Sequence, residues 1–424
     1  MKIALVIEHF DAARGGAEHF AVWLAEQLVQ HGHDVHVLCH DSARRSDRYR
    51  AAHHGASHDA IRSATAGGIK NASPPGAHIH QIRAAKLSTG MGFRQFGRGV
   101  ERWCHANAPD VVHSITVAFP GDVYHPQPGV YARIQAQAIS SRENPAAANF
   151  KRFTLGLSGK QRVLLEMEKK ATAQFNSGGP AKIVCISASV DQDFKDIYGV
   201  AAAQRVRLEN PMMYGPVSAQ TLTTDRQWFR SAYHLADNAR VAIFAGHDFR
   251  RKGLAWAIRA LAQAQTDWTL VVVGLGKVRK YLRIAEDLKV SARVKFIGPT
   301  RQIHRVYAGG DALLFPTFYD SFGLVALEAM AHGLFIISTR FLGCASIVTE
   351  LKMGSIVDSP RSVSDMAKAL DGIEPSLPRQ LARAADVSAR LANLGPAAYM
   401  KSLEAIYHQV AVEKSKFSGR GSVN

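Results

Sequence analysis

Two carboxylates flank an apolar run in the second half of the chain. Asp320 and Glu328 stand on either side of the segment SFGLVAL, in a sequence with only 35 acidic residues among 424. Ser321 is a residue type that caps helix N-termini. The next three amides would then point out of the helix and form an anion site: those of Phe322, Gly323 and Leu324.

An acidic group beside an anion site indicates a ligand that also carries hydroxyl groups, as a sugar does. Glu328 lies among apolar residues, where an unpaired carboxylate is costly to bury. A ribose diol, which offers two donors, would satisfy it. The spacing alone also fits a capping Asp and a surface Glu, so the two readings stay open at this point.

Two adjacent cations occur in the stretch FAGHDFRRKG. Arg251 and Lys252 could neutralise an anionic ligand, but on its own this stretch is better read as a solvated turn. Near the start of the chain, the first apolar run is followed by a glycine pair, Gly15 and Gly16. A nicotinamide enzyme is not expected, because Arg279 stands where the third glycine of a dinucleotide fingerprint would fall.

The first half contributes one further group of polar residues. His113 follows the apolar DVV and is predicted to end a strand, where a lone histidine is more often structural; only within the family pattern described below is it expected to face an interdomain cleft. Asp122 and His125 lie in the stretch FPGDVYHPQPGVYAR. The sequence has 19 histidines, but none lies in an H-E-x-x-H motif, so no metal site is predicted.

Apolar runs alternate with helical patterns in both halves of the chain. Residues 3–7 form a buried-strand run, followed by a helical pattern and the strand DVHVLCH. A second alternating series begins with VAIFAGH near residue 241 and ends with FIIST near residue 335. Such alternation predicts an α/β protein with two doubly wound, Rossmann-like domains that face a cleft.

We expect the domain boundary near residue 210. The N-terminal domain would comprise residues 1–209 and the C-terminal domain residues 210–395. Residues 396–424 would form a C-terminal helix, near 397–412, that can cross back to the N-terminal domain. The tail from Lys414 onward is expected to be frayed.

The stretch DSFGLVALEAMAHGLFIIST resembles the acid-x7-acid signature of retaining, nucleotide-sugar-dependent glycosyltransferases of family 4, which have the GT-B fold. RGGAEHF, DVVHS, FAGHDFRRKG and VVVGLGKVRKY match the family in the same order. Residues 240–350 are most similar to the lipopolysaccharide core glucosyltransferase branch. Two positions depart from the pattern: Asp320 replaces the usual Glu, and His247 replaces a frequent Arg.

The resemblance implies that residues 1–209 form the acceptor-side domain and residues 210–395 the nucleotide-sugar-binding domain. It also implies roles for the residues named above. Glu328 would hold the ribose of the donor. The sugar of the donor would be held by Asp320 and by the amides of Phe322, Gly323 and Leu324. The diphosphate would be neutralised by Arg251 and Lys252. The Gly15–Gly16 loop would approach from the other domain. The catalytic set would be Asp122, His113, Lys252 and Asp320.

The implied reaction transfers a hexose, with UDP-glucose the expected donor, to a lipopolysaccharide core or glycolipid without a metal cofactor. Retention would follow a front-face mechanism. The alternatives are a transferase for another polysaccharide or glycolipid, an epimerase or hydrolase of the same architecture, and a non-enzymatic membrane-binding module.

Composition favours a cytoplasmic protein, and its positive charge indicates either an anionic partner or a generally basic, solvated surface. The four cysteines are far apart, which argues against zinc and disulfides, and neither a signal peptide nor a membrane span is evident. The net charge is +17, with many basic residues between Arg44 and Arg102. The segment GFRQFGRGVERWCHA predicts a helix with Arg94, Arg98 and Arg102 on one face. This face either binds an anionic membrane or is an ordinary solvated surface. Nucleic acid is not an expected partner.

Overall fold

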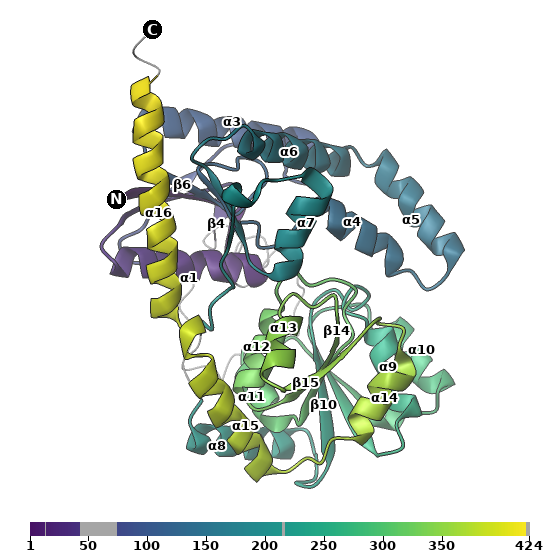
Figure 1. Cartoon of the computed structure of the whole chain (residues 1–424). Helices are drawn as coiled ribbons and strands as arrows, with labels where there is room; N and C mark the ends of the chain where they lie inside the picture. The colour runs from purple at the N-terminus through teal and green to yellow at the C-terminus, as the bar shows by residue number, and fades with distance from the viewer. Residues whose placement is uncertain (13, 43–73, 214–216, 421–424) are drawn as a thin grey trace, which may run out of the picture.

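The computed structural model describes residues 1–12, 14–42, 74–213 and 217–420. Two α/β domains lie one above the other, and the C-terminal helix α16 runs from the lower domain along the side of the upper one (Figure 1). Each domain is built around a parallel sheet, as the alternating pattern predicts. Of the predicted basic stretch, Arg44, Arg45, Arg48, Arg50, Arg62 and Lys70 lie outside the described residues.

The N-terminal domain contains a seven-stranded parallel sheet in the order β5-β3-β1-β6-β7-β8-β9. Its strands are β1 Lys2–Val6, β3 Asp34–Cys39, β5 His78–Gln81, β6 Val111–Ser114, β7 Val123–Tyr124, β8 Lys182–Cys185 and β9 Arg205–Arg207. Ile3 and Leu5 face one core and Ala4 and Val6 the other, so both faces of β1 are buried. A short parallel pair, β2 His9–Phe10 and β4 Asp41–Ser42, lies beyond β1 and β3.

Helices cover both faces of this sheet. They are α1 Gly16–Gln30, α3 Gly90–Asn107, α4 Tyr131–Ser140, α5 Pro145–Leu157, α6 Gly159–Asn176 and α7 Ala188–Tyr198. The apolar face of α3 packs into the core, with Phe93, Phe96 and Val100 buried. The reading of α3 as an ordinary domain helix therefore holds for its apolar face, which cannot also enter a membrane.

The C-terminal domain has a six-stranded sheet in the order β12-β11-β10-β13-β14-β15. Its strands are β10 Arg240–Ala245, β11 Trp268–Val273, β12 Val294–Gly298, β13 Ala312–Phe315, β14 Phe335–Thr339 and β15 Gly354–Val357. Its helices are α8 Ala219–Ala232, α9 Leu254–Gln263, α10 Arg279–Asp287, α11 Ile303–Gly309, α12 Leu324–Ala331, α13 Ala345–Glu350, α14 Val363–Asp371 and α15 Leu377–Arg390.

A buried ion triad fixes the start of β10. Asp311 accepts hydrogen bonds from Arg226 at 2.8 Å and from Arg230 at 2.9 Å, and also from the Val241 amide at 2.8 Å. The side chain of Asp311 is 1% exposed and that of Arg230 2%. Helix α8 is thereby held to the strands that carry the site.

The C-terminal helix α16, Pro396–Arg420, belongs to the core of the N-terminal domain. Met400, Leu403 and Tyr407 are fully buried in the same cluster as Phe20 and Leu24 of α1. The expected fraying from Lys414 is wrong as far as residue 420, because α16 continues to Arg420 and Lys414 contacts Asp122 at 2.9 Å.

The strand order reverses once in each sheet, between β1 and β6 and between β10 and β13. Ligands of open α/β sheets bind at such switch points, beyond the carboxyl ends of the strands. The loops at these ends meet across the two domains, since Ser321 Oγ donates to the Gln127 carbonyl at 2.6 Å. The two switch points therefore face each other.

Candidate active site

Lys252 and Asp320 meet at the switch point of the C-terminal sheet. Lys252 lies in the loop after β10, Asp320 in the loop after β13, and Lys252 Nζ donates to Asp320 Oδ2. Gly253 lets the two loops approach, because its φ is 81° and a Cβ there would lie 2.0 Å from the Pro316 carbonyl oxygen. Lys252 is 9% exposed, and burial lowers its pKa while the charge of Asp320 opposes that shift. The pair sets a cation and a carboxylate side by side.

Helix α12 begins directly after this pair. Gly323 is its N-cap residue, with a φ of 96°, and a Cβ there would lie 2.3 Å from Leu342 Cδ1. The prediction that Ser321 caps the helix is wrong, because its hydroxyl donates to Gln127 of the other domain instead. With no side-chain cap on α12, the first amides of the helix remain available for an anion.

Glu328 lies one turn into α12 and is partly buried. Its carboxylate accepts a hydrogen bond from the Tyr307 hydroxyl at 3.1 Å. Burial raises the pKa of Glu328 to about 7, although the Tyr307 hydrogen bond favours the ionised form. A ligand that donates hydrogen bonds to this carboxylate would stabilise its ionised form, which burial disfavours.

Other predicted donor-site residues surround this centre. The Arg251 guanidinium donates to the Tyr319 carbonyl at 2.9 Å and lies 3.4 Å from Asp248, so it is held in the loop. From the other domain, Gly16 begins α1, and a Cβ built on it would lie 3.7 Å from Leu324 Cδ1. The Gly15–Gly16 turn is thus brought up to the N-terminus of α12, whereas His247 is exposed.

The sequence matches known families over most of the described chain. Residues 14–211 match the family described as Glycosyltransferase Family 4, and residues 225–385 match Glycosyl transferases group 1. The two matches fall on the two domains in turn. The chain is a family 4 glycosyltransferase. Its two parallel-sheet domains are those of the GT-B fold.

The transferase has several characterised relatives. Lipopolysaccharide glucosyltransferase WaaG of Escherichia coli is 26% identical over 228 residues, which are 53% of this chain and 60% of WaaG. A D-inositol 3-phosphate glycosyltransferase of Corynebacterium urealyticum is 32% identical over 142 residues, 30% of this chain and 34% of that protein. The matched region thus spans less than two thirds of the length of either relative.

Solved structures share the fold of the transferase. The crystal structure of WaaG superposes with a TM-score of 0.69 at 21% identity, over 96% of this chain and 98% of WaaG. Sucrose-phosphate synthase of Thermosynechococcus elongatus superposes with a TM-score of 0.70 at 18% identity, over 96% of this chain and 98% of that protein. Anabaena HepE in complex with UDP gives 0.63 at 16%, over 98% of this chain and all of HepE.

Asp122, predicted as catalytic, lies at the wrong end of the sheet. It directly precedes β7, and its carboxylate accepts from the Val112 amide at 2.8 Å and from Lys414 at 2.9 Å. The cleft lies at the carboxyl ends of the strands, whereas Asp122 lies at an amino end. Asp122 therefore ties α16 to the sheet and is not part of the transferase's active site.

His113, also predicted as catalytic, does not face the cleft. It is fully buried, with Nδ1 2.6 Å from the Tyr407 hydroxyl and Nε2 3.2 Å from His125 Nδ1. Burial lowers the pKa of His113 to about 3, so the ring is neutral. Enclosed on both sides, it has no access to a substrate proton.

The sequence did not single out the residues at the other switch point. Thr116, two residues after β6, donates to Glu8, two residues after β1. Ser187, the N-cap of α7, donates to the Ser321 carbonyl at 2.7 Å. The only signal for these residues was their place just after an apolar run, which many other polar residues share.

Among the residues that the structure describes, no three or more His, Cys, Asp or Glu side chains are arranged to hold a metal ion. No helix within the same residues is both long and apolar enough to cross a membrane.

Proposed function

We propose that the transferase moves a hexose from a nucleoside diphosphate sugar to a lipopolysaccharide core or a related glycolipid, with UDP-glucose as the donor. The observation that carries this proposal is the meeting of Lys252, Asp320 and the N-terminus of α12 at a switch point that faces the other domain. A diphosphate needs the positive groups, and a sugar needs the carboxylate. Anabaena HepE, which has the same fold, was solved with UDP.

In this proposal each residue binds one part of the donor. Glu328 accepts from the ribose hydroxyls, and Asp320 with the amides at the start of α12 holds the hexose. Lys252 neutralises the diphosphate, with Arg251 beside it. The Gly15–Gly16 turn closes over the phosphates from the N-terminal domain.

The transfer proceeds on one face of the sugar. The bond from the anomeric carbon to the β-phosphate oxygen breaks, and a bond to the acceptor oxygen forms on the same side. The acceptor's proton passes to the leaving phosphate oxygen. Asp320 is already paired with Lys252, which suits hydroxyl binding better than nucleophilic attack. The charge that develops on the diphosphate is stabilised by Lys252 and α12, so no metal is required.

A panel of nucleotide sugars separates this function from its alternatives. We expect UDP-hexoses to raise the melting temperature, because a ligand that binds only the folded state stabilises it. Release of UDP should require a saccharide acceptor, with lipopolysaccharide core the best in a set of glycans. Equal turnover without acceptor would favour a hydrolase or epimerase, and preference for another glycan would reassign the acceptor.

The raised pKa of Glu328 predicts how nucleotide binding depends on pH. The ionised carboxylate accepts hydrogen bonds from the ribose hydroxyls more strongly than the protonated acid does, so UDP affinity should fall as the pH drops below about 7. In the free protein, between pH 4.5 and 7, the folded state keeps a proton that the unfolded state has released. The stability from neutral Glu328 is therefore present below pH 4.5 and lost as the pH rises through about 7.

Calorimetry with UDP from pH 5.5 to 8 measures this dependence, and Glu328→Gln is the matched control. The amide keeps the size of the side chain and does not titrate, so any pH dependence due to UDP itself remains in both proteins. At pH 8 the variant should bind UDP more weakly by about 1.5–3 kcal/mol, the range for a hydrogen bond to a charged group. Parallel pH profiles for the two proteins would refute the ribose assignment.

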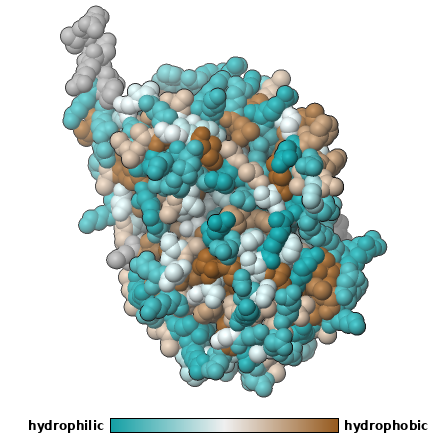
Figure 2. Space-filling view, turned by 45° about the vertical axis from the view of Figure 1, so that its right-hand side comes forward, coloured by the Kyte–Doolittle hydropathy of each residue, from teal (hydrophilic) through white to brown (hydrophobic). Residues whose placement is uncertain are grey.

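We place the enzyme on the inner face of the cytoplasmic membrane, held by the N-terminal domain. Helix α5 has no buried residue, and Phe150, Phe153 and Leu157 are 69%, 63% and 66% exposed. Figure 2 turns the α5 side of the upper domain forward, and brown apolar side chains stand there among teal polar ones. Lys151 and Arg152 lie between the two phenylalanines in the sequence, and α5 has no acidic residue.

Helix α3 adds positive charge, since α3 and α5 both pack against α6. Arg94 is paired with Glu166 at 2.7 Å. A groove of about 600 Å³ lies beside the same face. It is lined by the next two arginines, Arg98 and Arg102, and by Arg83, Gln95 and Glu101. An anionic lipid surface would complement this charge, at about 1 kcal/mol for each basic residue near it.

Replacing Phe150, Phe153 and Leu157 together with Ser should release the protein from anionic vesicles. Fully burying each such side chain contributes about 1.5–3 kcal/mol. Co-sedimentation with phosphatidylglycerol vesicles, beside phosphatidylcholine vesicles, measures the effect. Val412→Ser, which removes an apolar side chain that is 52% exposed on α16, is the control. Equal sedimentation of the triple variant and the parent would refute the α5 surface.

A further inference from the structure

A chain of buried polar side chains crosses the N-terminal domain. The Tyr407 hydroxyl lies 2.6 Å from His113 Nδ1, and His113 Nε2 lies 3.2 Å from His125 Nδ1. His125 Nε2 lies 3.1 Å from Gln127 Nε2, and the amides of Gln127 and Asn210 exchange two hydrogen bonds, of 3.0 and 2.7 Å. None of the five side chains is more than 6% exposed.

The amide of Gln127 fixes the direction of this chain. Its NH2 group donates to Asn210 and to His125 Nε2, so Nε2 is an acceptor and the His125 proton is on Nδ1. His125 then donates to His113 Nε2, and His113 donates to Tyr407. Both rings are neutral, in line with the burial that lowers the pKa of each. A fully satisfied buried network has one well-defined arrangement.

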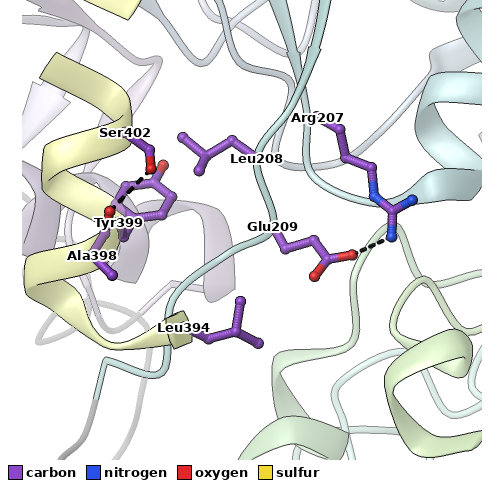
Figure 3. Close-up of a pocket in the computed structure, with 7 residues that line it drawn as sticks. All are labelled: Arg207, Leu208, Glu209, Leu394, Ala398, Tyr399 and Ser402. Carbon is purple, nitrogen blue, oxygen red and sulfur yellow. Dashed lines mark hydrogen bonds and ion pairs between the residues drawn. The ribbon is translucent and has the colours of Figure 1, made fainter. Parts of the chain in front are cut away.

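Both polypeptide connections between the domains contribute a residue to this hydrogen-bond network. Asn210 lies in the first connection, after β9, and Tyr407 lies on α16, the element that returns from the C-terminal domain. Figure 3 shows the two connections lining one pocket of about 300 Å³, with Arg207, Leu208 and Glu209 opposite Ala398, Tyr399 and Ser402. The Met212 amide also donates to the Leu394 carbonyl at 2.9 Å.

Gln127, within this network, also contacts the loop that carries Asp320 and Ser321, here called the donor loop. The backbone carbonyl of Gln127 accepts from Ser321 Oγ at 2.6 Å, and the Ser321 carbonyl accepts from Ser187 at 2.7 Å. Ser321 lies between Asp320 and the N-terminus of α12. Its two hydrogen bonds set where these groups stand relative to the N-terminal domain.

We propose that Gln127 is a positioning residue for sugar transfer. Through Ser321 it holds Asp320 and the start of α12 in register with the acceptor domain, and Asn210, His125, His113 and Tyr407 hold Gln127. The proposal rests on the proposed transferase function for its kinetic consequence. Its structural consequence, a donor loop ordered by a chain that begins on α16, can be measured without activity.

Tyr407→Phe tests the chain from its far end. The change removes one hydroxyl that lies three hydrogen bonds from Gln127, and Tyr399→Phe is the matched control. Tyr399 is buried on the same helix, and its hydroxyl has no hydrogen-bond partner among the described residues. We expect Tyr407→Phe to speed amide hydrogen exchange in residues 316–323 at least fivefold and to lower kcat at least fivefold. UDP affinity should stay within twofold, and Tyr399→Phe should change none of these.

The double variant Tyr407→Phe with Ser321→Ala decides whether the effect passes through Ser321. Once the Ser321 hydrogen bond is gone, loss of the Tyr407 hydroxyl should lower kcat by less than twofold further. Independent effects that multiply, or unchanged exchange in residues 316–323, would overturn the proposal. If the parent turns over no nucleotide sugar, the proposed function fails, and the exchange measurement still supports or overturns the positioning role.

Discussion

Lys252→Ala is expected to lower the rate of sugar transfer by a hundredfold or more. Loss of one preorganised donor to a developing negative charge commonly costs about 2.7–4 kcal/mol of transition-state stabilisation. Lys252 meets the conditions for such an effect, since it is 9% exposed and lies at the switch point beside Asp320. Because the charge on the diphosphate grows as its bond to the sugar breaks, kcat should fall more than donor affinity. Steady-state kinetics with a saturating acceptor measure both.

Arg250→Ala is the control for this prediction. Arg250 is an exposed cation in the same loop, so a loss of turnover from general charge removal would appear in both variants. We expect Arg250→Ala to change kcat by less than about twofold, because surface charges are largely screened. A chelator should leave the parent unaffected if Lys252 and α12 supply the positive charge. Loss of activity on chelation, restored by magnesium, would contradict that assignment, as would equal activity of Lys252→Ala and the parent.

The strands of the C-terminal domain could be predicted from the sequence for a physical reason. Parallel strands buried on both faces are continuous apolar runs, and β10, β11 and β13 each have this form. The loops after β10 and β13 could then be located, and with them Lys252 and Asp320. β15, with the sequence GSIV, is short and starts with Gly and Ser, so it gave no comparable signal.

The N-terminal domain was harder to predict, because several of its strands are short or polar. β5 has the sequence HIHQ on an edge of the sheet, and β7 has two residues. With β7 unrecognised, Asp122 could not be assigned to one end of a strand. A shift of only a few residues moves such a side chain from the cleft to the opposite end of the sheet.

His113 was placed correctly on its strand, yet its partner could not be inferred. Tyr407 is 294 residues away, on a helix that returns from the other domain. Hydrogen bonds over such a separation depend on packing, which local sequence patterns do not encode. The same holds for Ser321, a good capping residue by type, whose hydroxyl is taken by Gln127 across the cleft.

Asp311→Ala is expected to destabilise the C-terminal domain by about 3–5 kcal/mol, the range for breaking a buried ion pair from one side. Removing the carboxylate leaves Arg226 and Arg230 buried without their anion, at 7% and 2% side-chain exposure. The Val241 amide at the start of β10 also loses its acceptor. Since β10 leads into the loop of Lys252, UDP binding should be lost at a lower urea concentration than in the parent. Unfolding is followed by tryptophan fluorescence, to which Trp268 contributes because it is fully buried in β11.

Asp267→Ala separates the effect of burial from the loss of an acidic residue. Asp267 forms an ion pair with Arg293 at 3.5 Å in the same domain, but its side chain is 91% exposed. An exposed pair contributes little to stability, so this variant should unfold with the parent. The stability of Asp311→Asn should lie between those of Asp311→Ala and Asp267→Ala. Its amide oxygen can still accept from the Val241 amide, but it cannot neutralise two guanidinium groups. If Asp311→Ala unfolded at the same urea concentration as Asp267→Ala, the triad would not be what holds α8 to the strands of the donor site.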